Sequence, residues 1–487
     1  MSDPILLWNH VALDANRIDH TGSLRARNQR GPTLSARALA MVHIAMHDAY
    51  FGFVPAGAPF NPQGLEPVYA ENRVSAPAAP DNDDLVVVIS TAAHGVLIEL
   101  FPSQKDQFDR LLAGVMAGAA GKTSAKDFGE KVAASVVTRR KHDKSNITAE
   151  PVYKLGSGHH GPDPLSEPKG ILGEKFGDTD RFALSANRVE MAPPPGWTTD
   201  MPFDEKDPIY LHHYQEVKEK GRSASTTRTI EETVTGIYWA YDGVEEIGAP
   251  PRLYNQIAVQ IMNQRYHHAN SCARLIVNAR LLMLINVAMA DAAIEAWHYK
   301  FKFDLWRPVN GIRERGDRLG TDKKSPASTS IDPDADPFWE PLGAPNSNTV
   351  KKDFTPPFPA YPSGHATFGA AMFEMLRLYF EIKPDQPDNC AFDFISDEMN
   401  GLSKDSRGNV RPRHCRHHAS LLDAMYDNAL SRVYLGVHWR FDGTTAKSAS
   451  EILDDKTGMG GIPLGRKVAA EVLKNLNKDA KVPSAPM

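Results

Sequence analysis

Apolar residues recur at helical spacing along most of the chain. Between Leu34 and Tyr50 they repeat at intervals of three and four residues, as on the buried face of an amphipathic helix. The same spacing predicts helices over residues 84–101, 104–116, 124–141, 210–220, 226–241, 253–267, 271–303, 365–381, 388–402, 419–435, 441–455 and 463–477. The alternation typical of strands is scarce. The pattern therefore predicts an all-α protein built from helix bundles.

Three long segments without periodicity separate these helices. They cover residues 54–83, 143–208 and 313–361. Irregular segments of this length inside a compact protein are usually functional or wrap the core. The middle segment is also a candidate linker, which predicts an N-terminal helical unit over residues 1–208 and a C-terminal unit over residues 209–487.

Composition narrows the class of protein further. With 41% hydrophobic and 24% charged residues and a net charge of −5, the 487-residue chain is typical of a globular protein, which excludes collagen-like and disordered classes. The mild acidity argues against a nucleic-acid partner. An apolar run of about 18 residues, which would predict a membrane span, is missing, and the sequence does not begin with a secretory signal. The compartment stays open between the cytoplasm and export by a route without such a signal, and no membrane partner is expected.

Two cations lie close to the end of the helix predicted over residues 271–303. Lys300 and Arg307 are seven residues apart, about two helical turns, so both side chains are expected to face one ligand. Pro308 is expected to end the helix and to leave Arg307 near its C-terminus. The planar guanidinium of Arg307 suits bidentate contact with a tetrahedral oxyanion. The pair therefore predicts an anion site.

A second candidate follows the proline-rich residues 357–362. There Ser363, Gly364 and His365 open a predicted helix. A helix N-terminus offers unpaired amides to an anion, the Ser363 hydroxyl adds a donor, and Gly364 lets the backbone approach closely. His365 is then placed at the edge of the anion, where a general acid or base is needed.

A third candidate comes at the end of the helix predicted over residues 419–435. Arg432 belongs to its last turn, and Gly436 suits a left-handed C-terminal cap. This turn directs His438 back toward the face of Arg432, as a nucleophile or a ligand. Asp442 lies four residues later, where it either orients the His438 ring or favours the start of the next helix.

Together the three segments form the signature Lys-x6-Arg-Pro, Pro-Ser-Gly-His and Ser-Arg-x5-His-x3-Asp. It resembles the site of the vanadium-dependent haloperoxidases and of the type-2 phosphatidic acid phosphatase superfamily. The resemblance to the fungal chloroperoxidase type extends through residues 6–11, 34–39, 47–50, 241–243, 250–256 and 436–442. It implies two four-helix bundles with long irregular loops and a vanadate cofactor in the C-terminal bundle, with no redox cycling of the metal.

The resemblance also implies a role for each residue of the signature. His438 would be the vanadium ligand, and His365 the acid–base residue hydrogen-bonded to the apical oxygen. Lys300 would also withdraw electron density from bound peroxide. The residues expected to donate hydrogen bonds to vanadate are Lys300, Arg307, Ser363, Gly364 and Arg432.

Two aromatic residues match the halide side of the chloroperoxidases. They are Trp297 and Phe358, whereas bromoperoxidases of the algal type carry histidine at the second place. The match implies oxidation of chloride or bromide by hydrogen peroxide to hypohalous acid, with a small organic halogen acceptor. Core packing also explains such aromatics. Asp242 either supports the Lys300 or Arg432 cation or is a turn residue. The physiological halide, the acceptor and the oligomeric state stay open.

Two other functions use the same residues. In an acid phosphatase of the same superfamily, His438 would attack phosphorus and His365 would protonate the leaving alcohol. An oxyanion-binding protein would use the cations but would leave both histidines without a task. Similarity along the whole chain favours the haloperoxidase.

Several further patterns are interpreted as structural. His43 and His47 have the spacing of a zinc pair but lack the glutamate of HExxH. Residues 156–161 fit GxGxxG by letter, but no helix is predicted to follow. The histidine-containing run 414–418 is interpreted as a solvated basic loop. The 3 cysteines are too widely spaced for a disulfide framework or a CxxC metal pair.

Overall fold

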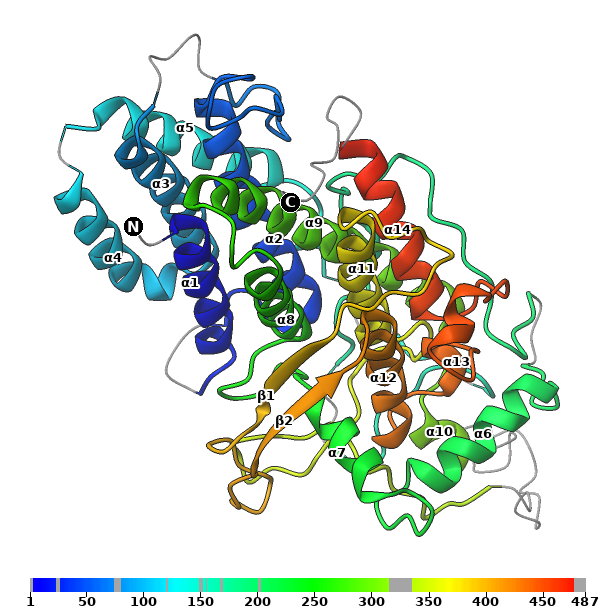
Figure 1. Ribbon diagram of the computed structural model, residues 1–487. Coiled ribbons are helices and arrows are strands. Elements are labelled where there is room, and N and C mark those ends of the chain that lie inside the picture. The colour runs from blue at the N-terminus through cyan, green and yellow to red at the C-terminus, as the bar shows by residue number, and fades with distance from the viewer. Residues whose placement is uncertain are drawn as a thin grey trace.

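The protein is mostly helical, as the periodicity predicted. The computed structural model describes residues 3–22, 27–73, 80–119, 121–148, 152–154, 156–166, 170–199, 203–314 and 335–476. Within these ranges, a two-stranded antiparallel hairpin is the only sheet (Figure 1). The all-α fold class is confirmed, with this hairpin as its exception.

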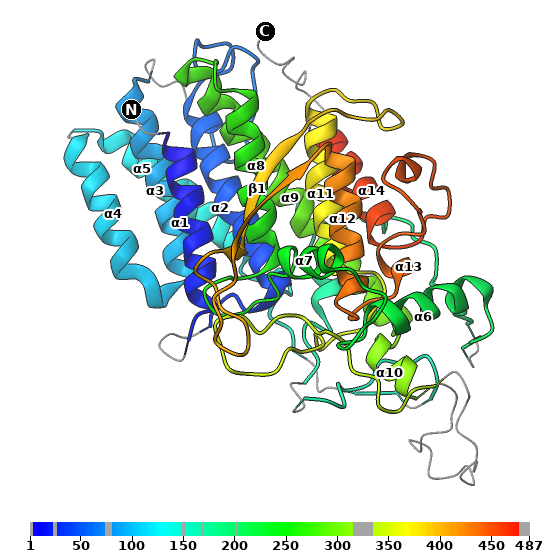
Figure 2. The same cartoon turned by 60° about the horizontal axis from the view of Figure 1, so that its bottom comes forward.

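Five helices form the N-terminal side of the molecule, coloured blue to cyan in Figures 1 and 2. They are α1 (Pro4–Asp19), α2 (Gly31–Phe53), α3 (Asn82–Leu100), α4 (Lys105–Gly118) and α5 (Thr123–Arg140), with the short η1 (Pro102–Gln104) between α3 and α4. Helix α2 is buried along most of its length, because α3, α5 and α9 pack around it. The sequence patterns did not predict α1, although Asp3 caps its first turn and Pro4 begins it.

Helix α9 (Ser271–Phe303) lies between the two sides of the molecule (Figure 2). It packs against α2 on one side and against α11 (Gly364–Tyr379) and α14 (Gly461–Leu476) on the other. Helix α9 is long and apolar enough to cross a membrane, with a mean hydropathy of 1.6 over an 18-residue window. Helix α3 and the segment η1–α4 meet the same criterion when they are taken together as one span, which is bent by 118°. However, 94% of the α9 window is buried inside the protein, which is the pattern of a core helix.

The remaining helices surround α9, α11 and α14 on the C-terminal side. They are α6 (Pro208–Lys220), α7 (Ile230–Tyr238), α8 (Pro250–Arg265), α10 (Pro308–Arg313), α12 (Leu421–Tyr434) and α13 (Arg440–Gly443), with the 3-10 turns η2 (Phe176–Asp178) and η4 (Ser450–Leu453). The described part of segment 143–208 runs along this side. The backbone amides of residues 182–184 donate to Asp291 on α9, so this part wraps the core. The domain boundary at residue 208 stays a prediction.

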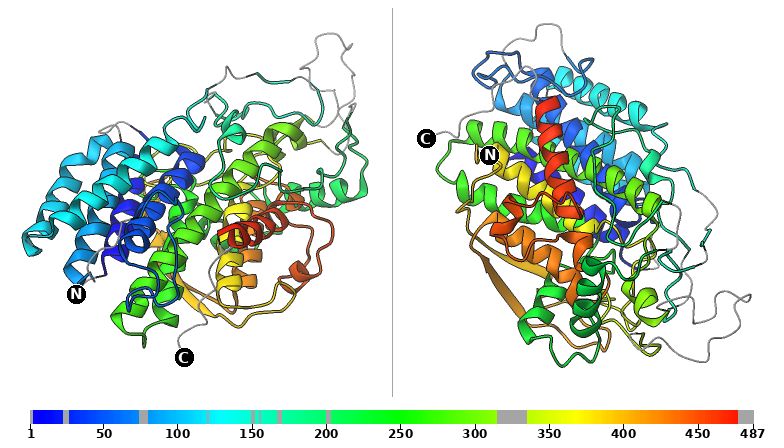
Figure 3. Two further views of the ribbon diagram at one scale, coloured as in Figure 1. Left: turned by 90° about the horizontal axis from the view of Figure 1, so that it is seen from above. Right: turned by 90° about the vertical axis from the view of Figure 1, so that its right-hand side faces the viewer.

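The helix predicted over residues 388–402 is wrong. This segment forms strand β1 (Phe392–Asn400), which pairs antiparallel with β2 (Arg413–His418), and the hairpin packs on α7, α8 and α12 at the surface (Figures 1 and 3). Phe392 and Phe394 follow the period of two that suits a strand, and the Phe392 ring stacks on His418 at 4.9 Å between ring centroids. The run 414–418 belongs to β2, so the expected basic loop is also wrong.

The helix predicted over residues 441–455 is also largely wrong. The chain makes the single turn α13 and the 3-10 turn η4, with an extended residue, Thr444, directly after α13 (φ −164°, ψ 152°). Gly443 and two β-branched threonines follow one another here, and these residues have low helix propensity. The segment therefore bends where helical periodicity alone predicted a continuous element.

Helices α11 and α14 cross at two glycines. A Cβ atom added to Gly461 would lie 2.7 Å from the carbonyl oxygen of Ser363, and one added to Gly465 would overlap the Thr367 carbonyl and lie 2.8 Å from Ala370 Cβ. The close approach presses α14 against the first turns of α11, where the predicted site residues lie. Larger residues here would separate the two helices.

We expect Gly465→Ala to lower the free energy of unfolding by about 1–3 kcal/mol, because the added methyl group overpacks this crossing. Thermal or denaturant unfolding measures the change. Gly114→Ala is the matched control, since a Cβ at Gly114 in α4 meets no atom within 4 Å. The control should be neutral or stabilising by up to about 1 kcal/mol through helix propensity. Equal effects of the two substitutions would contradict the packing argument.

Candidate active site

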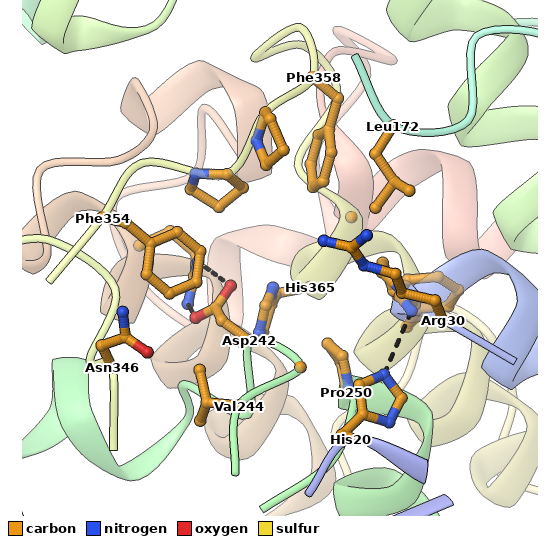
Figure 4. Close-up of a pocket in the computed structure, with 18 of the residues that line it drawn as sticks. His20, Arg30, Leu172, Asp242, Val244, Pro250, Asn346, Phe354, Phe358 and His365 are labelled. Atoms are coloured by element: carbon orange, nitrogen blue, oxygen red, sulfur yellow. Dashed lines mark hydrogen bonds and ion pairs between the residues drawn. The ribbon is translucent and has the colours of Figure 1, made fainter. Parts of the chain in front are cut away.

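Several of the predicted residues line a pocket of about 270 Å³ at the N-terminal end of α11. Gly364, His365, Arg432 and His438 line it and are buried, so they mark its inner end. Figure 4 shows His365 and Asp242 close together within the pocket, with Phe354 and Phe358 nearby. The pocket therefore joins the second and third sequence segments, whereas Lys300 and Arg307 of the first segment are not among its lining residues.

His438 is held by hydrogen bonds at both ring nitrogens. Its Nδ1 lies 2.8 Å from Asp442 Oδ2, and its Nε2 lies 2.8 Å from Arg307 Nη1. A guanidinium only donates, so Nε2 is the acceptor and Nδ1 carries the hydrogen. The Asp442 carboxylate also accepts from the backbone N–H of Trp439 at 3.0 Å. Asp442 thus orients the His438 ring, as its spacing suggested.

Arg307 enters the site from a different element than expected. Helix α9 ends at Phe303, where Asp304 takes the left-handed conformation (φ 52°), and Arg307 is the N-cap residue of α10. The prediction that Pro308 ends the helix of Lys300 is therefore wrong. Arg307 Nη1 also donates to the carbonyl of Val437 at 2.7 Å, while Nη2 is buried and lacks a hydrogen-bond partner among the described residues.

Arg432 is fixed by Asp242 in a bidentate ion pair. Its Nη1 and Nη2 lie 3.0 and 2.9 Å from the two carboxylate oxygens. Its Nε is buried and has no partner in the described part of the chain. Asp242 follows α7 in the chain and supports Arg432 rather than Lys300. Arg432 belongs to the last turn of α12, and Gly436 after it has φ 69°, as predicted.

Lys300 lies behind the pocket lining and is fully buried. Its Nζ donates to three backbone carbonyls, those of Pro359, Ala360 and Pro362, at 2.8, 3.0 and 2.5 Å. All three of its hydrogens are engaged in this conformation, so a direct hydrogen bond to a bound anion would require one of them to be exchanged. Lys300 contributes its charge to the site without such an exchange.

Helix α11 begins as the sequence predicted. Ser363 is its N-cap residue, and the hydroxyl oxygen accepts from the backbone N–H of Ala366 at 3.4 Å. His365 is the second residue of α11 and lines the pocket, and its Nε2 donates to the carbonyl of Ala240 in the loop after α7. The backbone carbonyl of His365 accepts from Tyr254 and Asn428 at 2.9 Å each. These contacts hold the imidazole and leave Nδ1 as its second nitrogen.

The two aromatics expected at the halide side lie against each other. The Trp297 and Phe358 rings are 5.0 Å apart between centroids, at an angle of 53°. Lys300 Nζ lies 5.6 Å from the Trp297 ring centroid and 5.1 Å from that of Phe358. Gly364 fits this wall closely, because a Cβ there would lie 3.4 Å from the Trp297 ring. The wall thus separates the buried cations from the rest of the pocket.

Burial and mutual repulsion depress the pKa values of the basic groups. Burial, and then the charge of Arg307, hold the pKa of Lys300 well below its usual range. Burial lowers the pKa of Arg307 to about 9 and that of His365 to about 3, the latter with a contribution from Arg432. Burial and the charges of the three cations also lower the pKa of His438. Bound anionic charge would relieve this repulsion and raise these pKa values.

Comparisons with known proteins identify the family of the chain. The model of the vanadium chloroperoxidase N-terminal domain matches residues 2–117, and that of the VCPO second helical-bundle domain matches residues 280–478. The vanadium chloroperoxidase of Curvularia inaequalis is 32% identical over 99% of this chain and 91% of that protein. The chain belongs to the vanadium-dependent haloperoxidase family. Vanadate is the cofactor of this family.

Solved structures of other haloperoxidases share the fold of this one. A bacterial vanadium-dependent iodoperoxidase gives a TM-score of 0.66 at 18% identity, with 98% of this chain and 97% of that chain covered. A bacterial vanadium-dependent chloroperoxidase in its holo form gives 0.59 at 17% identity, with 91% and 92% covered. The helical haloperoxidase fold is therefore confirmed independently of the site residues.

The donor set of this haloperoxidase fits vanadate. Arg307 Nη2 and Arg432 Nε are buried donors without a protein partner among the described residues, and a buried donor normally has one. Three cations, Lys300, Arg307 and Arg432, face two carboxylates, Asp242 and Asp442. The excess of positive charge and the free donors together suit a tetrahedral oxyanion.

Two groups at the site carried no signal in the sequence. The carbonyl of Ala240 fixes the His365 ring, and the sequence does not indicate it because every residue has a backbone carbonyl. His160, within the GxGxxG-like run 156–161, lines a second cavity of about 20 Å³ together with Arg307, and neither of its ring nitrogens has a partner among the described residues. Asn310 Oδ1 and Thr355 Oγ1 in the same cavity also have no partner in the part of the chain that the structure describes. The cavity has room for one water molecule.

The remaining histidine patterns are structural, as interpreted. His43 contacts the carbonyl of Leu39 and the side chain of Asn9, and His47 contacts Asp48 and Arg280. In the described ranges, no group of three or more His, Cys, Asp or Glu side chains has the arrangement of a metal site.

Proposed function

We propose that this protein oxidises chloride as well as bromide with hydrogen peroxide, producing hypohalous acid. The proposed oxidation of chloride rests on one observation, the aromatic wall that Trp297 and Phe358 form over the buried Lys300 and Arg307. The Curvularia relative is named a chloroperoxidase, which supports the same halide. Chloride is harder to oxidise than bromide and therefore needs a more electrophilic oxidant.

The proposed vanadate site uses the groups that converge at the inner end of the pocket. Arg307 Nη2, Arg432 Nε, the Ser363 hydroxyl and the Gly364 amide donate hydrogen bonds, and His438 Nε2 is the ligand. When bound, vanadate supplies Lewis-acid activation of hydrogen peroxide. The hydrogen bond from Nδ1 to Asp442 keeps the Nε2 lone pair available, and Arg307 Nη1 must release that lone pair.

His365 handles the proton in this proposal. Its low pKa keeps the ring neutral at neutral pH, and the hydrogen bond from Nε2 to Ala240 leaves a lone pair on Nδ1. Nδ1 accepts a proton from hydrogen peroxide as it enters the site. An anion beside the ring raises the pKa of His365 toward the working range, so the same nitrogen returns the proton later.

Trp297 and Phe358 exclude water from the side on which the halide arrives. Both are buried, with Trp297 0% and Phe358 8% exposed. In a dry site the charge of Lys300 is little screened and polarises its surroundings more strongly. The apolar wall thereby supports chloride oxidation in addition to bromide oxidation.

We expect Phe358→His to lower the ratio of chloride to bromide turnover by about tenfold, an effect of roughly 1.4 kcal/mol on the chloride barrier. The imidazole adds a polar group beside Lys300 and Arg307 and brings water into the pocket. The measurement is the ratio of the two halogenation rates of a diketone dye by vanadate-loaded protein, from acidic to slightly alkaline pH.

Phe358→Leu is the matched control, because it removes the ring but keeps the wall apolar. It should retain most of the wild-type ratio. An unchanged ratio in Phe358→His, or a wild type that is inert to chloride at every pH tested, would contradict the proposed chloride activity.

A further inference from the structure

The outer half of the main pocket is built differently from its inner end. Its inner residues come from α11, α12 and the turn at His438, whereas its mouth is shared between the start of α2 and the irregular segment 346–358. Arg27, Arg30 and Lys351 line the mouth and are exposed. None of these three cations is assigned a task by vanadate or halide chemistry at the inner end.

The backbone next to Arg30 is held at the mouth by contacts with distant residues. Arg30 is the N-cap residue of α2, and the N–H of the next residue, Gly31, donates to His20 Nε2 at 3.1 Å. Gly31 has φ 77° and lies against Leu172, so that a Cβ would come 2.8 Å from the leucine side chain. Leu172 in turn contacts the aromatic wall, because its carbonyl accepts a hydrogen bond from Trp297 Nε1 at 3.2 Å. Figure 4 shows the Arg30 side chain directed into the pocket, near Leu172 and Phe358.

The mouth carries a net positive charge. Arg27, Arg30 and Lys351 have no ion-pair partner among the described residues, and the lining carboxylate Asp242 is already paired with Arg432. Glu245 is the other carboxylate of the described lining. His20 adds no charge, because burial lowers its pKa. A carboxylate or other organic anion is therefore attracted to this position.

An apolar surface lies within the same pocket. Leu172, Phe354, Pro356, Pro357 and Phe358 line it, and the proline-rich segment is rigid. The pocket of about 270 Å³ has room for on the order of ten water molecules, which is more than hydrogen peroxide and one halide need. A concave apolar wall with a few fixed polar groups is the usual form of a small-molecule site.

We propose that the mouth binds the organic halogen acceptor, and that this acceptor is a small aromatic or other apolar molecule with an anionic group. The anionic group lies on Arg30, and the apolar body lies against Phe354 and the proline-rich wall, facing the inner end. There the acceptor carbon forms a bond to halogen as the oxygen–halogen bond of hypohalous acid breaks, and the proton of the acceptor joins the hydroxide to give water. This inference rests on the proposed function, which supplies the hypohalous acid.

A competition between two phenols tests the proposal. Vanadate-loaded protein with bromide and limiting hydrogen peroxide is given equal amounts of 3-(4-hydroxyphenyl)propionate and its neutral primary amide, and the ratio of the brominated products is measured. Reagent hypobromous acid gives the intrinsic ratio of the pair. We expect wild type to exceed the intrinsic ratio in favour of the anion on the order of threefold to tenfold. Because both products form in one vessel, the ratio does not depend on the rate of bromide oxidation.

Substitutions assign the selectivity to Arg30. Arg30→Gln should return the product ratio to the intrinsic value, and Arg30→Lys should retain part of the selectivity. Arg110→Gln removes an exposed arginine on α4, outside the pocket lining, and should leave the wild-type ratio. Saturation-transfer NMR of the two phenols with vanadate-loaded protein, without peroxide and bromide, should show stronger binding of the anion in wild type and the loss of this preference in Arg30→Gln.

The outcomes separate the two proposals. A wild-type ratio equal to the intrinsic value overturns the acceptor site, because the phenols then react with released hypohalous acid. A slower bromide reaction in Arg30→Gln with an unchanged product ratio also overturns it, since the cation would then only attract halide. Absence of bromination by wild type would instead contradict the proposed function, and the NMR preference would still decide whether the mouth binds the anion.

Discussion

His438→Ala should weaken the retention of vanadate by at least about 100-fold and abolish halide oxidation. The expectation follows from the position of the ring: Asp442 fixes the hydrogen on Nδ1, so Nε2 is the nitrogen that can act as a ligand. Arg307 contacts the same nitrogen, so the guanidinium of Arg307 lies beside the position proposed for the anion. Equilibrium dialysis of vanadate-free protein against orthovanadate, with vanadium measured by mass spectrometry, gives the dissociation constant.

His10→Ala is the control for this substitution, because His10 is an exposed histidine on α1. It should leave both vanadate retention and turnover unchanged. If His438→Ala retained vanadate as tightly as wild type while remaining folded by circular dichroism, the ligand role of His438 would be wrong.

His365→Ala should leave vanadate retention within a few-fold of wild type and lower turnover by about 10²- to 10⁴-fold, the usual loss for a general acid–base group. Within the described ranges the side chain makes one hydrogen bond, to the Ala240 carbonyl, and its neutral Nδ1 is the proton acceptor of the proposal. Steady-state bromide oxidation at saturating vanadate measures the loss, and dialysis measures retention in the same preparation.

The two histidine substitutions are informative as a pair. The proposal requires His438 to act mainly on vanadate binding and His365 mainly on turnover. Equal losses of vanadate binding in both variants would falsify this division of roles, whatever the size of the losses.

Local features of the site were predictable because neighbouring residues determine them. The N-cap at Ser363 depends on the turn that follows it, and the left-handed Gly436 depends on the end of α12. The hydrogen bond between His438 and Asp442 likewise joins residues four apart. Short spacing was enough to place each of these groups correctly.

Contacts between distant segments were beyond the sequence pattern. Asp242 and Arg432 are 190 residues apart, and the carbonyls that hold Lys300 come from a loop about sixty residues away. Helical spacing also failed where Asp304 adopts a left-handed conformation and separates Lys300 from Arg307. The pocket mouth was missed for the same reason, since Arg30 comes from the opposite end of the chain.

The mistaken helices have a common physical cause. Residues 388–402 contain enough apolar positions to satisfy helical spacing, but the tertiary contacts of Phe392 with His418 and Phe373 favour a strand at the surface of the bundle. For short amphipathic segments, such contacts override intrinsic propensity. The long buried helices were predicted well because their periodicity extends over many turns.

The central claim is that one vanadate, held in this pocket, makes the protein a halide-oxidising enzyme. Its most direct test is a titration of vanadate-free protein with orthovanadate, followed by halogenation of a diketone dye with chloride and with bromide. The account predicts that activity rises to a plateau at one vanadate per chain, that phosphate competes with vanadate, and that both halides react. Full turnover after exhaustive dialysis against phosphate, with no vanadate added back, would contradict it.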